Sequence, residues 1–297
     1  MQYTMRNVIQ TIGNTPLVEL TSFNLKPGVK IFAKLEGNNP AGSVKDRAAL
    51  NMIRSAIERG ELKKGDKLIE ATSGNTGIAL AMIASTFGLQ MEIVLPANST
   101  RERTLAIEAF GATFTLQEDM EASRRYAQKK ADEEGYFLLN QFDNDDNYKS
   151  HIKSTAPEIW KDTNGKITHF ISAMGTTGTI MGNSIFLKEQ NPAIQAIGCQ
   201  PGIGEAIPGI PRWSPEYMPK FFDPSKVDRI VDITEVDSTM RTRQMARNEG
   251  IFAGMSTGGA LHVALQVADE IEEGVIVFIA CDRGDRYLSS NLFGDVI

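Results

Sequence analysis

The sequence predicts an α/β fold in which mostly parallel strands are flanked by helices. Short apolar runs alternate with longer helical patterns along most of the 297 residues. Such alternation is typical of strands that pair in parallel through helical crossovers. Three of the strand-to-helix turns are also rich in glycine and hydroxyl side chains. A chain of this length can form two lobes or one large domain, because it can bury more than one sizeable core.

The regular alternation begins after the first forty residues. Before it, a turn followed by an alternating pattern occupies 11–20, and a clearer strand is expected at 29–36. Pro40 and Gly42 indicate a turn, after which a helix is expected from Lys45 through 53. Further strands are expected at 67–71, 91–95, 113–116, 136–140, 167–173, 194–200, 229–233 and 275–281. Further helices are expected at 78–87, 100–110, 120–134, 148–161, 178–190, 238–248 and 257–271.

Two segments interrupt this alternation. Residues 143–147 (DNDDN) form the most polar stretch and indicate either a boundary between lobes or an ordinary surface loop. Residues 201–224 contain six prolines, three glycines and four aromatic residues around Arg212, so no regular structure is expected there. Irregular segments of this length are usually functional or mobile.

Composition excludes several classes of function. A net charge of −6 argues against a general nucleic-acid or anionic-membrane binder, and no apolar run is long enough to span a membrane. The first residues lack the apolar core of a secretory signal. With only Cys199 and Cys281, a disulfide framework is not expected, which favours the reducing cytoplasm. The three histidines are scattered, so we expect no metal site.

Lys45 occupies an unusual place for a lysine. Ser43 is a suitable N-cap, which would put Lys45 in the first turn of a helix, where the helix dipole is positive. In one interpretation Lys45 is an ordinary solvated lysine. In the other, the dipole lowers its pKa and leaves an amine able to attack a carbonyl group and form a Schiff base. The segment alone favours the first interpretation.

The three glycine-containing turns each precede a helix and could bind anions through free N–H groups. The turn at 174–179 (MGTTGT) adds threonine hydroxyls and lacks a P-loop lysine, so it suits the phosphate of a cofactor. The turn at 72–77 (TSGNTG) suits a carboxylate. The turn at 254–259 (GMSTGG) matches neither a nucleophile elbow nor a dinucleotide fingerprint. Each of these turns, taken alone, could be merely structural.

These turns are expected to meet, because ligands of α/β sheets collect at the carboxyl ends of the strands. One lysine, one phosphate site and one carboxylate site together predict pyridoxal 5'-phosphate holding an amino acid. The motifs, in this order and spacing, resemble those of the fold-type II pyridoxal-phosphate enzymes, and among them the O-acetylserine sulfhydrylases or cysteine synthases. The resemblance extends from 12–17 (IGNTPL) to 286–289 (RYLS).

The resemblance implies a fold like that of the tryptophan synthase β-subunit, with two lobes and the cofactor in the cleft between them. The smaller lobe would comprise residues 40–145, and the larger one residues 1–39 plus 146–297. Three segments resemble the B-type cysteine synthase, which implies that thiosulfate is accepted alongside sulfide. These segments are 36–40 (EGNNP), 211–213 (PRW) and 281–287 (CDRGDRY).

The family also implies roles for individual residues. Lys45 would carry the cofactor and act as the base for the α-proton. Asn75 would bind the phenolic oxygen of the cofactor as well as substrate. The phosphate would be held by Gly175, Thr176, Thr177, Gly178 and Thr179. The substrate carboxylate would be held by Thr72, Ser73, Thr76 and Gln141.

Three further residues have competing interpretations. Ser256 would face the pyridine nitrogen, where a neutral hydroxyl suits β-elimination better than transamination, or it is simply a helix N-cap. Arg212 would bind a dianionic sulfur donor through forked hydrogen bonds, or it is a surface arginine. Cys281 would lie near the cofactor ring, or it is a packing residue. No catalytic role is expected for Asp46 or Arg47.

The sequence therefore predicts a cytoplasmic enzyme of cysteine biosynthesis that replaces the acetate of O-acetyl-L-serine. Sulfide would give L-cysteine and thiosulfate would give S-sulfocysteine, and the family implies a homodimer. Use of O-phosphoserine, a serine or threonine dehydratase activity, and a cofactor-binding partner protein without turnover are the alternatives. Neither a nucleic-acid nor a membrane partner is expected.

Overall fold

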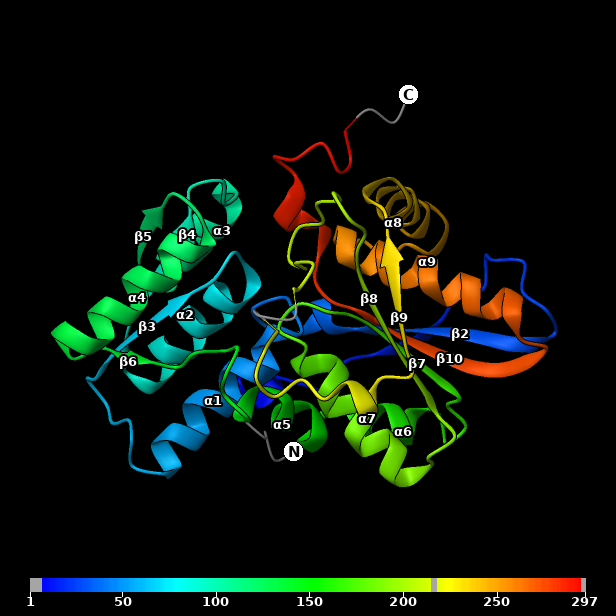
Figure 1. Cartoon of the computed structure of the whole chain (residues 1–297), viewed down its shortest axis with the longest axis horizontal. Coiled ribbons are helices and arrows are strands. Elements are labelled where there is room, and N and C mark those ends of the chain that lie inside the picture. Colours follow the sequence, from blue (N-terminus) through cyan, green and yellow to red (C-terminus); the bar gives the residue numbers. More distant parts are fainter. Residues whose placement is uncertain (1–6, 215–217, 295–297) are drawn as a thin grey trace, which may run out of the picture.

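The computed structural model describes residues 7–214 and 218–294, which contain two sheets flanked by helices (Figure 1). All neighbouring strands are parallel except the first two, which pair antiparallel. The larger sheet has the order β1 (Leu17–Glu19), β2 (Gly28–Leu35), β10 (Glu273–Ala280), β7 (His169–Ala173), β8 (Gln195–Pro201) and β9 (Arg229–Ile233). The smaller sheet has the order β5 (Thr113–Gln117), β4 (Gln90–Pro96), β3 (Lys67–Ala71) and β6 (Phe137–Leu138).

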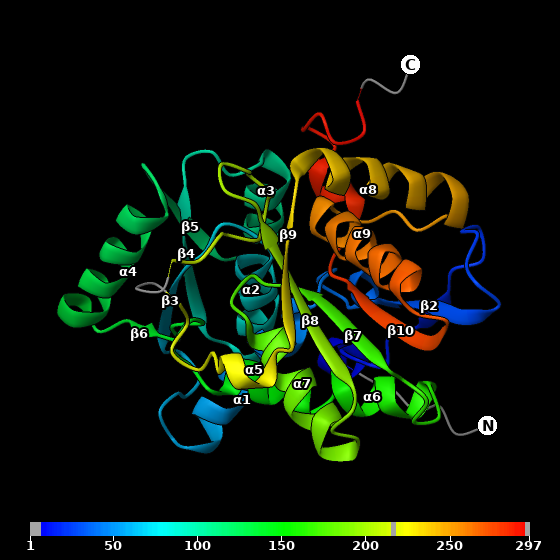
Figure 2. The same ribbon diagram turned by 45° about the vertical axis from the view of Figure 1, so that its right-hand side comes forward.

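Nine α-helices cover these sheets within the described ranges. Four of them belong to the first half of the chain, namely α1 (Lys45–Glu58), α2 (Asn75–Phe87), α3 (Arg101–Ala109) and α4 (Met120–Glu134). The others are α5 (Asp146–Lys153), α6 (Thr155–Asp162), α7 (Gly178–Gln190), α8 (Glu235–Glu249) and α9 (Met255–Glu270). Figure 2 shows α8 and α9 on one side of the larger sheet and α6 and α7 on the other. None of the helices described is long and apolar enough to cross a membrane.

Alternation of side chains along each strand explains why both faces of the larger sheet are covered. Ile276 and Phe278 of β10 pack in the core cluster that contains α9. Val277 and Ile279 point to the opposite face and join the cluster that contains α7. Successive strand residues face opposite sides of a sheet, so a continuous apolar strand needs helices on both sides.

The smaller sheet is built in the same way. Leu68 and Ile93 pack with α1 and α2, whereas Ile69 and Val94 pack against Ala127 of α4 on the other face. Helix α1 contacts both α2 and α5, so it lies at the junction between the two sheets. The first residue of α1 is therefore placed beside both of them.

Most predicted elements are confirmed, with three differences. The predicted helix at 148–161 is two helices, because the backbone leaves the helical conformation at Ser154 (φ −136°, ψ −68°). The predicted strand at 136–140 is reduced to β6, and Asn140 adopts a left-handed conformation (φ 52°) just after it. Ser43 is not the N-cap of α1, since that position is Val44, although the Oγ of Ser43 accepts a 3.2 Å hydrogen bond from the Lys45 N–H.

The two sheets support the proposed division into lobes without testing its boundaries. All strands of the smaller sheet lie within 67–138, and those of the larger sheet lie within 17–35 and 169–280. We therefore keep 40–145 as the proposed smaller lobe and 1–39 plus 146–297 as the proposed larger lobe.

Candidate active site

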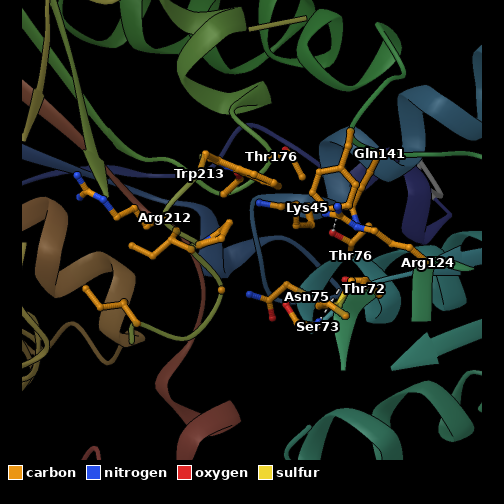
Figure 3. Close-up of a pocket in the computed structure, with 18 of the residues that line it drawn as sticks. Lys45, Thr72, Ser73, Asn75, Thr76, Arg124, Gln141, Thr176, Arg212 and Trp213 are labelled. Carbon is orange, nitrogen blue, oxygen red and sulfur yellow. Dashed lines mark hydrogen bonds between the residues drawn. The ribbon is translucent and has the colours of Figure 1, made fainter. Parts of the chain in front are cut away.

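A cavity of about 530 Å³ lies between the sheets (Figure 3). A smaller pocket adjoins this cavity. The two share Lys45, Asn75 and the start of the turn between β7 and α7. Of the predicted site residues, the cavity is lined by Lys45, Thr72, Ser73, Asn75, Thr76, Gln141, Gly175, Thr176 and Arg212. The adjoining pocket adds Thr177, Thr179, Ser256 and Cys281. Gly178 lies between two of these residues as the first residue of α7, so the structure brings the whole predicted set together.

Lys45 is tied to the end of β10. The N–H of Val44 donates a 2.8 Å hydrogen bond to the carbonyl of Cys281, and Ser43 forms a β-bridge with Asp282. Burial lowers the pKa of Lys45, against the opposing effects of Cys281, Asp282 and Glu36. A lowered pKa was expected from the helix dipole, but burial is its largest cause. The result is an amine that loses its proton more readily than an exposed lysine.

The turn between β7 and α7 has the features of a phosphate site. Thr177 has a left-handed backbone (φ 65°), and its hydroxyl is buried without a hydrogen-bond partner among the described residues. The first N–H groups of α7 have no intrahelical acceptor, as at any helix start. At Gly178 a Cβ atom would lie 2.2 Å from Oδ1 of Asn147, so the close approach needs glycine. This arrangement fits the phosphate of pyridoxal phosphate.

The turn between β3 and α2 is held from two sides. The hydroxyl of Thr76 donates a 2.7 Å hydrogen bond to Oε1 of Gln141, and Nη1 of Arg103 donates to the carbonyl of Ser73 at 3.1 Å. Nε2 of Gln141 in turn donates to the carbonyl of Ala71. These contacts fix the first turn of α2, whose free N–H groups favour an anion such as a carboxylate.

Asn75 is engaged by the segment that follows β10. Its Nδ2 donates to Oδ2 of Asp282 at 2.6 Å, and its Oδ1 accepts from Nη1 of Arg286 at 2.7 Å. Tyr287 also donates to Oδ2 of Asp282, and Oδ1 of Asp282 is buried without a partner among the described residues. The role of Asn75 toward the cofactor thus stays a prediction, since both ends of its amide bind protein here.

The residues predicted to face the pyridine ring lie at the start of α9 and the end of β10. Ser256 is buried in the first turn of α9, after the N-cap Gly254. Burial raises the pKa of Cys281 to about 11, so its thiol is neutral at neutral pH. A neutral hydroxyl and a neutral thiol therefore line this part of the pocket, and the carboxylate of Asp282, which binds Asn75 and Tyr287, also belongs to the pocket lining.

Arg212 is placed differently from the expectation. Its guanidinium donates to the carbonyl of Pro201 at 2.8 Å and lies 2.8 Å from Oδ1 of Asp232. Figure 3 shows this group pointing away from Lys45. A cation that already has a carboxylate partner is a poor receptor for a second anion.

Several residues of the site were not predicted from the sequence. Arg124 of α4 lines the cavity, but its position in a charged amphipathic helix resembled a solvated surface residue. Asn147 donates from Nδ2 to the carbonyl of Gln141 and to Oγ1 of Thr176, thereby linking the two sides of the site. Its polar segment gave no signal beyond that of a loop. Asp282 and Arg286 belong to a quoted motif, yet only the fold shows that they contact Asn75.

Glu70, which lies beside the site, makes the stability of the folded protein depend on pH. Its buried carboxylate accepts hydrogen bonds from the N–H groups of Asn140 and Gln141 at 2.8 and 3.3 Å. Burial raises its pKa to about 7. The folded protein therefore keeps this proton between about pH 4.5 and 7 while the unfolded chain loses it, so the contribution of Glu70 to stability falls as pH rises through this range.

We predict that Glu70→Gln removes this pH dependence. Between pH 4.5 and 7 the free energy of unfolding of the variant should fall by roughly 3 kcal/mol less than that of the wild type, from 1.36 kcal/mol per pKa unit. Urea denaturation at pH 5, 6 and 7 measures this difference in slope. Parallel curves for the two proteins would show that Glu70 titrates alike in the folded and unfolded states.

The fold and the site together define a class of protein: an α/β enzyme with a partly buried lysine beside a turn suited to a phosphate. The model of the family described as "Pyridoxal-phosphate dependent enzyme" matches residues 8–282, and the chain belongs to this family. Cysteine synthase B of Pseudomonas aeruginosa is 53% identical over 289 residues, covering 96% of this chain and 97% of that protein. Cysteine synthase B of Escherichia coli is 52% identical over 294 residues, with coverages of 98% and 97%.

Solved structures agree with these relatives. A cysteine synthase from Entamoeba histolytica has a TM-score of 0.91 at 37% identity, covering 98% of this chain and 91% of that one. An O-ureido-L-serine synthase has a TM-score of 0.93 at 34% identity, with coverages of 99% and 97%. The predicted fold class and the requirement for pyridoxal phosphate are thereby confirmed.

Proposed function

We propose that this protein makes L-cysteine from O-acetyl-L-serine and sulfide, and S-sulfocysteine when thiosulfate replaces sulfide. One observation carries the proposal: the cavity and its adjoining pocket bring the partly buried amine of Lys45 together with two helix starts whose free N–H groups suit a carboxylate and a phosphate. The similarity to cysteine synthase B of three bacteria over nearly the whole chain supports the same substrates.

Different residues of the cavity perform different parts of a β-replacement reaction. When bound, pyridoxal phosphate supplies an electron sink for the α-carbon of the amino acid. The turn at 72–76, with Gln141, orients the substrate carboxylate. Nζ of Lys45, with its lowered pKa, accepts the proton from the α-carbon as acetate leaves the β-carbon. The sulfur nucleophile bonds to the β-carbon, and Lys45 returns the proton to the α-carbon.

The neutral groups near the pyridine side favour this reaction over transamination. Ser256 cannot stabilise a positive charge on the ring as a carboxylate would, so electrons are more readily passed to the leaving acetate. Cys281 keeps its proton at neutral pH because burial raises its pKa. We propose that both residues line the cofactor without exchanging protons with it.

The test is steady-state kinetics in which two amino acids are crossed with two sulfur donors. O-Acetylserine and O-phosphoserine are each paired with sulfide and thiosulfate, and acetate or phosphate release is followed together with the sulfur product. We expect O-acetylserine with sulfide to give the highest kcat/KM, and O-acetylserine with thiosulfate to give S-sulfocysteine. Release of pyruvate and ammonia from serine, without formation of cysteine, would instead establish a dehydratase.

We extend the proposal to a homodimer that works in the cytoplasm. The resemblance to the cysteine synthases supports the homodimer. The two cysteines, which are both free, support a reducing compartment.

A further inference from the structure

Arg124 is a cation of the cavity whose function the proposed reaction leaves unassigned. It projects from the first turns of α4 into the cavity, which it lines together with Lys45, Thr76 and Gln141 (Figure 3). Its Cζ lies 4.1 Å from the centre of the Phe142 ring and 5.8 Å from that of Trp213. The two rings meet edge to face at 5.6 Å, so they form an aromatic wall behind the guanidinium.

The stacking leaves the hydrogen-bond donors of Arg124 free. A guanidinium that packs on a ring uses its flat face, whereas all five N–H groups lie in its plane and point outward. Within 7–214 and 218–294, Arg124 forms neither an ion pair nor a hydrogen bond, and its Nε is buried without a partner. Burial lowers the pKa of Arg124, and the nearby carboxylate of Glu70 opposes this effect when it is ionised.

The other arginines of the cavity already have acceptors among the described residues. Arg212 is held by Asp232 and the carbonyl of Pro201. Arg103 donates from Nη1 to the carbonyl of Ser73 although its Nε is also buried without a partner, and Arg286, which lies just outside the cavity lining, donates to Asn75. Among the described arginines of the cavity, Arg124 is thus the one that has no acceptor for any of its donors. A buried donor without an acceptor costs free energy, so a ligand that supplies oxygens gains binding energy there.

We propose that Arg124 binds the tetrahedral oxyanion of the sulfur donor and selects thiosulfate over donors without oxygens. The inference rests on the proposed function, because it assigns the second substrate of that reaction. The forked donors of a guanidinium match two oxygens of such a group, whereas sulfide has no oxygen to accept them. The aromatic wall of Phe142 and Trp213 keeps the guanidinium of Arg124 in one orientation. The carboxylate of the amino acid is bound separately, at the start of α2.

The first test is kinetic and uses Arg124→Gln, with Arg125→Gln as a matched control. Arg125 is the next residue of α4, its side chain is 66% exposed, and it pairs with Glu121. For Arg124→Gln we expect kcat/KM for thiosulfate to fall about 10- to 100-fold, as for loss of hydrogen bonds to a charged group. The fall in kcat/KM for sulfide should be much smaller, so the ratio of kcat/KM for thiosulfate to that for sulfide should decrease. Arg124→Lys keeps the positive charge but loses the paired N–H donors of the guanidinium. Its kcat/KM for thiosulfate should lie between those of the wild type and Arg124→Gln.

The second test measures binding without turnover. Trp213 lies beside Arg124, and Trp160 is the only other tryptophan of the chain. In holoenzyme carrying Trp160→Phe, we expect the fluorescence of Trp213 to change saturably on titration with sodium thiosulfate. Adding Arg124→Gln should raise the Kd by the same 10- to 100-fold, whereas adding Arg125→Gln should leave it unchanged.

The outcomes separate this inference from the proposed function. Equal thiosulfate binding by Arg124→Gln and Arg125→Gln overturns the role of Arg124, and so does a wild type that binds no thiosulfate. A loss confined to O-phosphoserine with sulfide also overturns it, because the oxyanion would then belong to the amino acid. If the wild type binds thiosulfate through Arg124 but yields no S-sulfocysteine, the inferred binding site stands and the thiosulfate reaction fails.

Discussion

Replacing Lys45 with alanine is expected to lower kcat for cysteine formation by about 10³-fold or more. A positioned general base contributes about 10²- to 10⁴-fold, and Lys45 is also the proposed point of attachment of the cofactor. Among the described residues, Lys45 is the one lysine in the cavity lining, and the end of β10 fixes its position. The measurement is kcat with O-acetylserine and sulfide, together with the visible absorption of lysine-linked pyridoxal phosphate.

Two variants make this result specific. Lys45→Arg keeps the positive charge but lacks an amine that can give up its proton near neutral pH, so it should be as inactive as Lys45→Ala. Lys63→Ala removes an exposed lysine and should retain wild-type kinetics. Substantial turnover by Lys45→Ala, or persistence of the lysine-linked absorption band in it, would show that another group holds the cofactor.

Replacing Arg47 with alanine is expected to lower the free energy of unfolding by about 3–5 kcal/mol, the cost of breaking a buried ion pair. Its Nε lies 2.7 Å from Oε2 of Glu36, and its Nη1 lies 2.7 Å from Oε1 of Glu158. Lys34 completes the network at 2.9 Å from Glu158. Removing Arg47 would leave the fully buried Glu36 without a cation, which is the source of the large effect.

Urea denaturation of the holoenzyme measures this loss, and Arg54→Ala is the matched control. Arg54 lies two turns further along α1 and is exposed, so its removal should change stability by no more than about 0.5 kcal/mol. In the wild type, Arg47 holds the pKa of Glu158 at about 2 even though burial opposes this. Glu158 therefore stabilises the fold above about pH 4.5 and loses this contribution as pH falls toward 2, a loss that should shrink in Arg47→Ala. Equal urea midpoints for Arg47→Ala and Arg54→Ala would mean that the ion pairs of Arg47 add no net stability.

Much of the fold was predictable because its signals are local. Strands such as β10 are continuous apolar runs, and β3 and β7 end in glycine-containing turns that start a helix. The predicted helix at 148–161 was wrong because Pro157 lies inside it. A proline has no N–H to donate to the carbonyl of Lys153 and its ring crowds that carbonyl, so the helix breaks at Ser154 and Pro157 falls in the first turn of α6. The short β6 was harder to predict, since the left-handed backbone of Asn140 has only a weak sequence signature.

The chemistry of the site was likewise predictable where its signals are local and unpredictable where it depends on distant contacts. By its own pattern, the sequence determined which residue types lie at each turn: Lys45 at a helix start, the hydroxyls at 72–76 and 176–179, and a neutral Ser256. Only the tertiary structure decided how charges are paired, because pairing depends on atoms distant in the chain. Arg212 is bound by Asp232, whereas Arg124 stacks on Phe142 with its donors free. The same guanidinium chemistry thus serves structure at one position and, as we propose, substrate recognition at the other.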